Sequence, residues 1–214
     1  MTRNLIVGSK LVVRDSSYKL MNKNTVIITF ALLLCMVKPA FGGSETRSID
    51  SAHSTLTVYV YKTGLLSGLG HNHEIEAPIE SGDVKDSENS SVELRVKSGE
   101  LRVLDTEVSG DTRAKIQATM LSAEVLDVDH FPEIHFRSTR VEVAGEDHWV
   151  VHGNLDLHGQ TRPISFEVAL KGGLYTGSTV LKQSDFGITP VKVAGGAVKV
   201  KDEIKVAFSI ALAK

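Results

Sequence analysis

The dominant pattern along the chain is an alternation of apolar and polar residues that begins near Ile49 and continues to the C-terminus. Apolar residues at every second position predict β-strands with one buried face, because successive side chains of a strand point to opposite sides. Clusters of Gly, Ser and Asp interrupt the alternation about every ten residues and predict the turns of hairpins. The clearest strands are predicted at 56–61, 92–97, 149–157, 164–170 and 204–212.

One central segment departs from this alternation and predicts a helix of about three turns. Ser109 and the residues just after it offer an N-terminal cap, and the segment 127–132 ends the helix before a strand resumes at Ile134. The apolar residues at helical spacing are Ile116, Met120, Ala123 and Leu126.

Many antiparallel strands in one small domain must close or stack to hide their edges. About eight strands can close into a barrel whose interior holds a slender ligand. The predicted fold is therefore all-β: an antiparallel up-and-down barrel of about eight strands with one helix inserted mid-chain. No linker divides residues 43–214, which are predicted to form one domain.

The N-terminal segment 1–42 is predicted to be a secretory signal peptide that is cleaved near Gly42. Residues 25–37 form an uncharged apolar run preceded by Lys19 and Lys23. This run falls short of the roughly 20 apolar residues of a transmembrane helix, so no stable membrane span is expected. The mature protein is expected in the periplasm or outside the cell.

Composition excludes several classes of function. Removing residues 1–42 leaves 18 Lys and Arg against 25 Asp and Glu, a net charge of −7, which disfavours nucleic acid as a partner. The single cysteine, Cys35, lies in the predicted signal peptide, so the mature domain has no disulfide, thiolate metal site or cysteine nucleophile. Met21 would give a more typical signal peptide than Met1 and is the preferred start.

Two histidines at 71–73 suggest a catalytic or metal site, but neither possible motif is complete. The letters HNH lack the wide spacing of the nuclease motif, and Ala77 occupies the place of the second histidine of H-E-x-x-H. On a strand that begins near His71, His71 and His73 would share one face about 6.5–7 Å apart and could bind one metal. Hydrogen-bonded or surface histidines are the favoured interpretation, because zinc sites need three or four ligands. The histidines that could complete such a site are His53, His130, His152 and His158.

No other catalytic motif is present in full. Asp185-Phe186-Gly187 lacks the other signatures of a kinase, and no G-x-S-x-G motif occurs. The sequence therefore predicts a protein that is not an enzyme and has no metal cofactor.

Four segments resemble the YceI-like family, in order, along nearly the whole mature chain. SIDSAHSTLTVYV (48–60) is similar to the opening strand of the family, and RAKIQATMLSAEVLDVDHFPEIHFRST (113–139) to its helix-to-strand signature. VHGNLDLHGQTRPISFEV (151–168) resembles its next hairpin, and SDFGITPVKVAGGAVKVKDEIKVAFSIAL (184–212) its closing strand. The resemblance implies an exported, lipocalin-like barrel that binds a polyisoprenoid chain in an apolar lumen, and it suggests a homodimer.

Periodicity alone fits a filled barrel as well as a hollow one, so only the resemblance assigns the apolar residues to a lipid-binding lumen. The segment Leu65-Leu66 and the helix residues Met120 and Leu121 are expected at the mouth or lid, since such side chains adapt to a lipid tail. The other residues predicted to contact the lipid are Leu56, Val58, Val60, Val92, Leu94, Phe136, Trp149, Val151, Phe166 and Phe208.

The predicted function is therefore non-catalytic binding of a long apolar lipid, with a polyisoprenoid as the expected ligand. Two alternatives stay open at this point. One is a periplasmic metal-binding or redox-linked factor that uses His71 and His73. The other is a filled barrel that acts only through its surface, as the partner of another protein.

Overall fold

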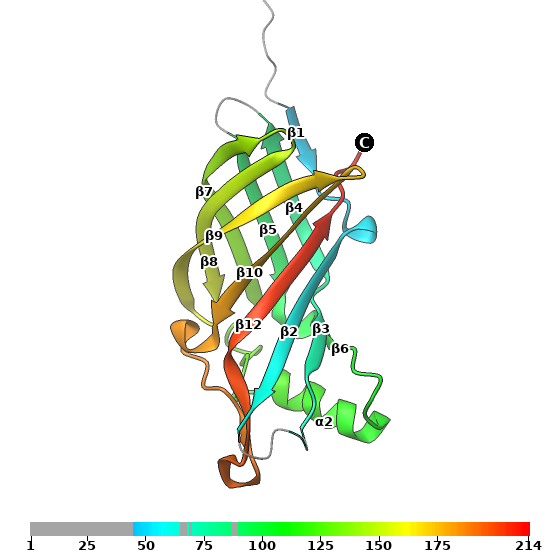
Figure 1. Cartoon of the computed structure of the whole chain (residues 1–214), viewed down its shortest axis with the longest axis vertical. Helices are drawn as coiled ribbons and strands as arrows, with labels where there is room; N and C mark the ends of the chain where they lie inside the picture. The colour runs from blue at the N-terminus through cyan, green and yellow to red at the C-terminus, as the bar shows by residue number, and fades with distance from the viewer. Residues whose placement is uncertain (1–44, 65–67, 69, 87–89) are drawn as a thin grey trace, which may run out of the picture. The chain divides into compact units, whose positions relative to one another are not determined.

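The structure, a computed structural model, describes residues 45–64, 68, 70–86 and 90–214. The predicted signal peptide and the predicted mouth residues Leu65 and Leu66 lie outside these residues. A single antiparallel sheet dominates the described part of the chain (Figure 1). Within it, no helix has the length and apolar character that a membrane crossing requires.

The sheet contains twelve strands, and all of its strand pairs are antiparallel. The strands are β1 (Glu45–Ser48), β2 (Thr55–Thr63), β3 (His73–Glu76), β4 (Ile79–Asp86), β5 (Ser91–Lys97), β6 (Arg102–Val103), β7 (Glu133–Gly145), β8 (His148–Leu157), β9 (Gln160–Lys171), β10 (Leu174–Lys182), β11 (Lys192–Val193) and β12 (Val198–Ile210). Short 3₁₀ helices are η1 (Ser51–His53), η3 (Ser98–Glu100), η4 (Gln183–Phe186) and η5 (Ala194–Gly196). The α-helix of the described chain, α2 (Gly110–Leu121), lies between β6 and β7, which confirms the predicted all-β class with a mid-chain helix.

A bend between β3 and β4 curls the sheet into a barrel. The strand order is β1-β4-β5-β7-β8-β9-β10-β12-β2-β3-β6, with β11 paired to β12. Only Ala77 and Pro78 separate β3, which pairs with β2, from β4, which pairs with β5. The Ala77 N–H still donates to the carbonyl of Leu56 at 2.9 Å, so the bend keeps contact with β2. The count exceeds the predicted eight because β3 and β4 form one bent wall strand and β1, β6 and β11 are short peripheral strands.

The two ends of the described chain meet beside β1. The Ile49 N–H donates to the carbonyl of Gly82 on β4 at 2.7 Å, and the Ala213 N–H donates to the carbonyl of Ser48 at 2.8 Å. The chain after β1 therefore lies between β4 and the end of β12. Three buried isoleucines narrow the barrel at this place: Ile49, Ile79 and Ile210. We call this the β1 end of the barrel.

The opposite end of the barrel, near α2, is the α2 end (Figure 1). The largest fully buried side chains of the described chain are those of Phe186 in η4, Val96 at the end of β5 and Ser98 in η3. The side chain of Gln117 ties α2 to this end, because it donates to the carbonyl of Leu101 and accepts from the N–H of Val103. The α2 end is thus closed by packed side chains and by hydrogen bonds.

The helix α2 begins as predicted but ends earlier. Ser109 caps it by accepting from the Thr112 N–H at 3.2 Å. The last helical residue is Leu121, whereas the apolar spacing predicted a helix that continues to Leu126. The prediction was wrong because the Ser122 hydroxyl forms local bonds to its neighbours, which compete with continuation of the helix. Leu126 is buried all the same, so its position in the pattern reflected burial rather than helix.

Candidate ligand-binding cavity

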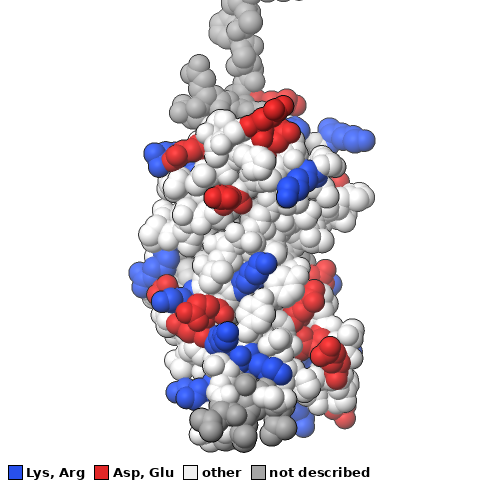
Figure 2. Space-filling model, in the orientation of Figure 1, with Lys and Arg blue, Asp and Glu red and all other residues white. Residues whose placement is uncertain are grey.

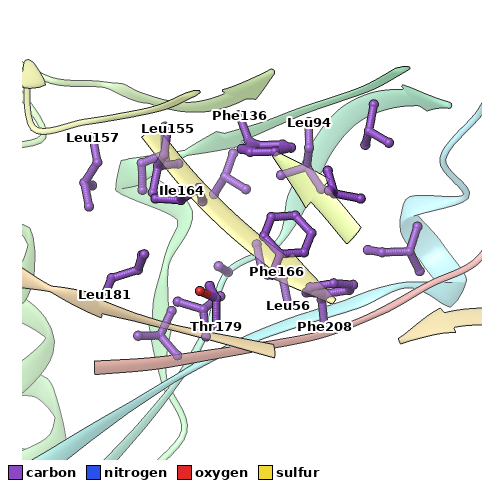
Figure 3. Close-up of a pocket in the computed structure, with 18 of the residues that line it drawn as sticks. Leu56, Leu94, Phe136, Leu155, Leu157, Ile164, Phe166, Thr179, Leu181 and Phe208 are labelled. Atoms are coloured by element: carbon purple, nitrogen blue, oxygen red, sulfur yellow. The ribbon is translucent and has the colours of Figure 1, made fainter. Parts of the chain in front are cut away.

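The barrel encloses a cavity of about 320 Å³, which lies within the usual size range of small-molecule sites. Its wall is formed by inward-facing residues of the wall strands, including β10, and its α2 end by side chains of α2, of the turn after α2 and of η4. Figure 3 shows side chains from opposite sides of the barrel pointing into this space.

A row of three phenylalanine rings crosses the cavity. The ring centre of Phe166 lies 5.4 Å from that of Phe136 and 5.4 Å from that of Phe208, and both pairs are tilted or edge-on, as aromatic pairs prefer. Figure 3 shows Phe166 between the other two. A side chain on Gly177 would meet the Phe208 ring at 2.5 Å, so this glycine leaves room for the ring to lie over its strand. The rings therefore leave space beside them for a slender chain.

Most of the residues that the sequence predicted for the lumen line this cavity. Those that do are Leu56, Val58, Val60, Val92, Leu94, Met120, Phe136, Trp149, Val151, Phe166 and Phe208. Leu121 packs against the core next to the cavity without lining it. Leu65 and Leu66 lie outside the described residues. Contact of any of these residues with a lipid stays a prediction.

The parts of the cavity that sequence reasoning missed include the wall strand β10 and one cap. The inward face of β10 carries Tyr175, Thr179 and Leu181, and these do alternate in the sequence. Gly177 and the exposed Val180 hide that alternation, although the turn at 172–173 was a usable signal. Phe186 and Ile188, which line the α2 end, belong to a short helix and a loop that no periodic pattern marks.

His73 pairs with a buried carboxylate. Its Nδ1 lies 2.6 Å from Oδ2 of Asp105, whose side chain is only 4% exposed. The other carboxylate oxygen of Asp105 accepts from the Glu74 N–H at 2.9 Å, and the Asp105 carbonyl accepts from Arg113 of α2. This pair therefore joins β3 to the segment that precedes α2. Neither His73 nor Asp105 is among the residues that line the cavity.

The geometry expected for a shared metal at His71 and His73 is absent. β3 begins at His73 rather than near His71, so His71 is an exposed residue ahead of the strand and shares no strand face with His73. In the part of the chain that the structure describes, no three His, Cys, Asp or Glu side chains come together as metal ligands. The other histidines considered have their own neighbours: Asp50 for His53, Asp127 for His130, Glu142 for His152 and the Phe186 carbonyl for His158.

A small antiparallel barrel around an apolar cavity is the architecture of barrel proteins that hold one small ligand. Residues 48–212 match the model of the YceI-like domain. The chain belongs to the YceI-like family, as the resemblance of its sequence motifs predicted.

Curated relatives carry the name UPF0312 protein. The one from Pseudomonas putida strain W619 is 38% identical over 77 residues, which cover 31% of this chain and 40% of that protein. The match thus spans two fifths of the length of that relative. The one from Shewanella baltica strain OS155 is 26% identical over 149 residues, which cover 65% of this chain and 73% of the relative.

Two solved structures share the fold. BcnA of Burkholderia cenocepacia superposes with a TM-score of 0.61 and 18% identity over 78% of this chain and 99% of BcnA. A polyisoprenoid binding domain from Saccharophagus degradans, implicated in plant cell wall breakdown, gives a TM-score of 0.51 with 15% identity over 78% of this chain and 97% of that domain. These similarities establish the lipocalin-like barrel fold of the chain.

Proposed function

We propose that this protein is an exported, non-catalytic binding protein that holds a long apolar lipid, a polyisoprenoid, in the barrel cavity. The observation that carries the proposal is the hydrocarbon wall of a cavity of about 320 Å³. Burial of apolar ligand surface in such a space contributes about 25 cal/mol per Å², or about 0.8 kcal/mol per methylene group. The family membership and the fold shared with a polyisoprenoid binding domain support a lipid as the ligand.

The location of the polar groups supports binding rather than catalysis. The His73–Asp105 pair joins β3 to the segment before α2 and does not line the cavity. Within the described residues, Thr179 supplies one of the few hydroxyl groups of the wall, and its side-chain oxygen is the only one drawn in Figure 3. The cavity thus offers apolar surface for a ligand and few groups that could transfer a proton.

Export is supported by the predicted signal peptide of residues 1–42. Cell fractionation followed by N-terminal sequencing of the purified protein is expected to find a mature chain that begins near Gly43. An N-terminus at Met1 or Met21 in the cytoplasmic fraction would contradict export. Sedimentation of the same material tests the homodimer that the family resemblance suggests.

Lipid extraction from the purified protein, followed by mass spectrometry, tests the ligand. The wild-type protein is expected to release an isoprenoid lipid in an amount comparable to the protein. Thr179→Phe fills the cavity from β10, whereas Val180→Phe places the same ring on the outer face, because neighbouring residues of a strand point to opposite sides. Val180 is already 61% exposed, so it is the matched control.

The expected result is loss of the lipid from Thr179→Phe and retention in Val180→Phe, with both variants folded by circular dichroism. Wild-type protein without bound lipid that also fails to take up an added isoprenoid would contradict the proposal. So would equal lipid content in the two variants, because the lipid would then lie outside the cavity.

A further inference from the structure

The charged residues that line the cavity are all cations. Among the described lining residues they are Arg47, Lys85 and Lys182, and none is Asp or Glu. This differs from the domain as a whole, since residues 43–214 contain more Asp and Glu than Lys and Arg. It also differs from the outer surface, where Figure 2 shows both signs of charge intermixed on the visible face. Carboxylates are thus kept away from the cavity of an acidic protein.

Of the three cations, Arg47 is the one whose strand position faces inward. Arg47 lies opposite Val84 on β4, and Val84 lies opposite Val92 on β5; both valines line the cavity. Residues directly opposite each other in a sheet share one face, so Arg47 belongs to the inner row. Lys85 follows Val84 and Lys182 follows the inward-facing Leu181, which places both on the outer face.

The two ends of the cavity differ in polarity. Arg47 lies at the β1 end, where β8 and β10 also begin (Figure 1). The second residues of these strands, Trp149 and Tyr175, line the cavity with ring centres 5.7 Å apart, and each combines an apolar ring with a hydrogen-bond donor. At the α2 end, apolar side chains such as Met120 and Phe186 cover the cavity, and the buried amide of Gln183 there already donates to the carbonyl of Lys201.

We infer that the ligand is a lipid with an anionic headgroup, a carboxylate or a phosphate, which Arg47 binds at the β1 end while the chain points toward the α2 end. The guanidinium group suits this role, because its planar fork of N–H donors matches carboxylate and phosphate oxygens. This inference rests on the proposed function and adds to it the headgroup chemistry and the orientation of the ligand.

Three ligands with the same isoprenoid chain test the inference: farnesol, farnesoic acid and farnesyl phosphate. Trp149 is the only tryptophan of the chain and lines the cavity, so its fluorescence reports binding to the delipidated protein. At least one anionic ligand is expected to bind about tenfold or more tightly than farnesol, since hydrogen bonds to charged groups are the strong ones. The tighter of the two anions identifies the headgroup.

Variants of Arg47, with a control at Arg140, test whether Arg47 causes the preference for the anion. Arg47→Gln is expected to remove the preference for the anion, so that farnesol and the two anions bind with similar Kd, and circular dichroism checks that the variant is folded. Arg47→Lys should keep part of the preference. Arg140→Gln makes the same change of side chain at an exposed residue of β7 and should behave as wild type.

Equal binding of the three ligands would overturn the inference and leave the proposed function standing. A preference for the anion that persists in Arg47→Gln would also overturn the inference and leave the proposed function standing, because another group would then bind the headgroup. If none of the three ligands binds, both the proposed function and the inference fail.

Discussion

The middle of the barrel and its α2 end are built in opposite ways. Around Phe166, wall side chains border open space, and the wall is nearly free of polar groups. At the α2 end, Phe186 is 2% exposed, and the buried carboxylate of Asp105 has a hydrogen-bond partner at each oxygen. The difference indicates a division of labour. Packing at the α2 end stabilises the fold, so the wall is left free to adapt to a ligand.

The largest effect is expected from Phe186→Ala, which removes a fully packed ring at the α2 end. Such a change in a core costs about 4 kcal/mol, because it loses the buried ring and leaves a void. Phe166→Ala is the comparison: its ring is only partly buried, so its removal loses fewer packing contacts and should cost less, about 3 kcal/mol. Denaturant unfolding of the ligand-free protein measures both. Similar losses in the two variants would contradict the division of labour.

A second effect is expected at Asp105. Asp105→Asn removes the negative charge that accepts from the Glu74 N–H and pairs with Nδ1 of His73, so about 2 kcal/mol of unfolding free energy should be lost. Thr179→Val in the cavity wall keeps the shape of the side chain and should leave the unfolding free energy nearly unchanged. Urea denaturation measures the unfolding free energy of the two variants. A larger loss in Thr179→Val than in Asp105→Asn would contradict the prediction.

A series of isoprenoid ligands of increasing chain length tests the cavity wall without any mutation. Each methylene group buried in the cavity should lower the free energy of binding by about 0.8 kcal/mol, or roughly fourfold in Kd. The gain should stop once the chain fills the cavity. Titrations followed by Trp149 fluorescence measure the series. A Kd independent of chain length from the shortest member on would place the lipid outside the cavity.

The smallest expected effect is on the stability of the protein at acidic pH. The Ser184 hydroxyl and N–H both donate to the Asp202 carboxylate, and these bonds lower the pKa of Asp202 from its ordinary value of 3.8. A lowered pKa stabilises the folded protein above the unfolded value, and this stability is lost as the pH falls below about 3.8 toward the folded pKa. Asp202→Asn should therefore flatten the decline of the urea midpoint as the pH falls below about 3.8. An unchanged slope would show that other carboxylates govern the decline.

The alternation of apolar residues predicted the fold class and the buried faces of several strands, because a strand with one buried face imposes a period of two on the sequence. The prediction that these faces line a cavity came from the family resemblance. Phe166 and Phe208 were identified from these two signals. The pairing of His73 with Asp105 was not, because 32 residues separate them and only the closed barrel brings them together. Phe186 was missed for a related reason: a 3₁₀ helix of four residues leaves no period to detect.

The meeting of the chain ends at β1 has a consequence for how the domain can be rearranged. Ser48 and Ala213 are hydrogen-bonded neighbours, so a short linker could join the C-terminus to the start of β1 without moving either strand. The exposed turn at Gly172 and Gly173 could then supply new termini. Such a circular permutant would keep every wall strand in place, and the linker would replace the natural termini at the β1 end. Because this turn directly precedes β10, it lies at the same end of the barrel, and lipid uptake by the permutant would report whether moving the chain opening from β1 to the β9–β10 turn changes entry of the ligand.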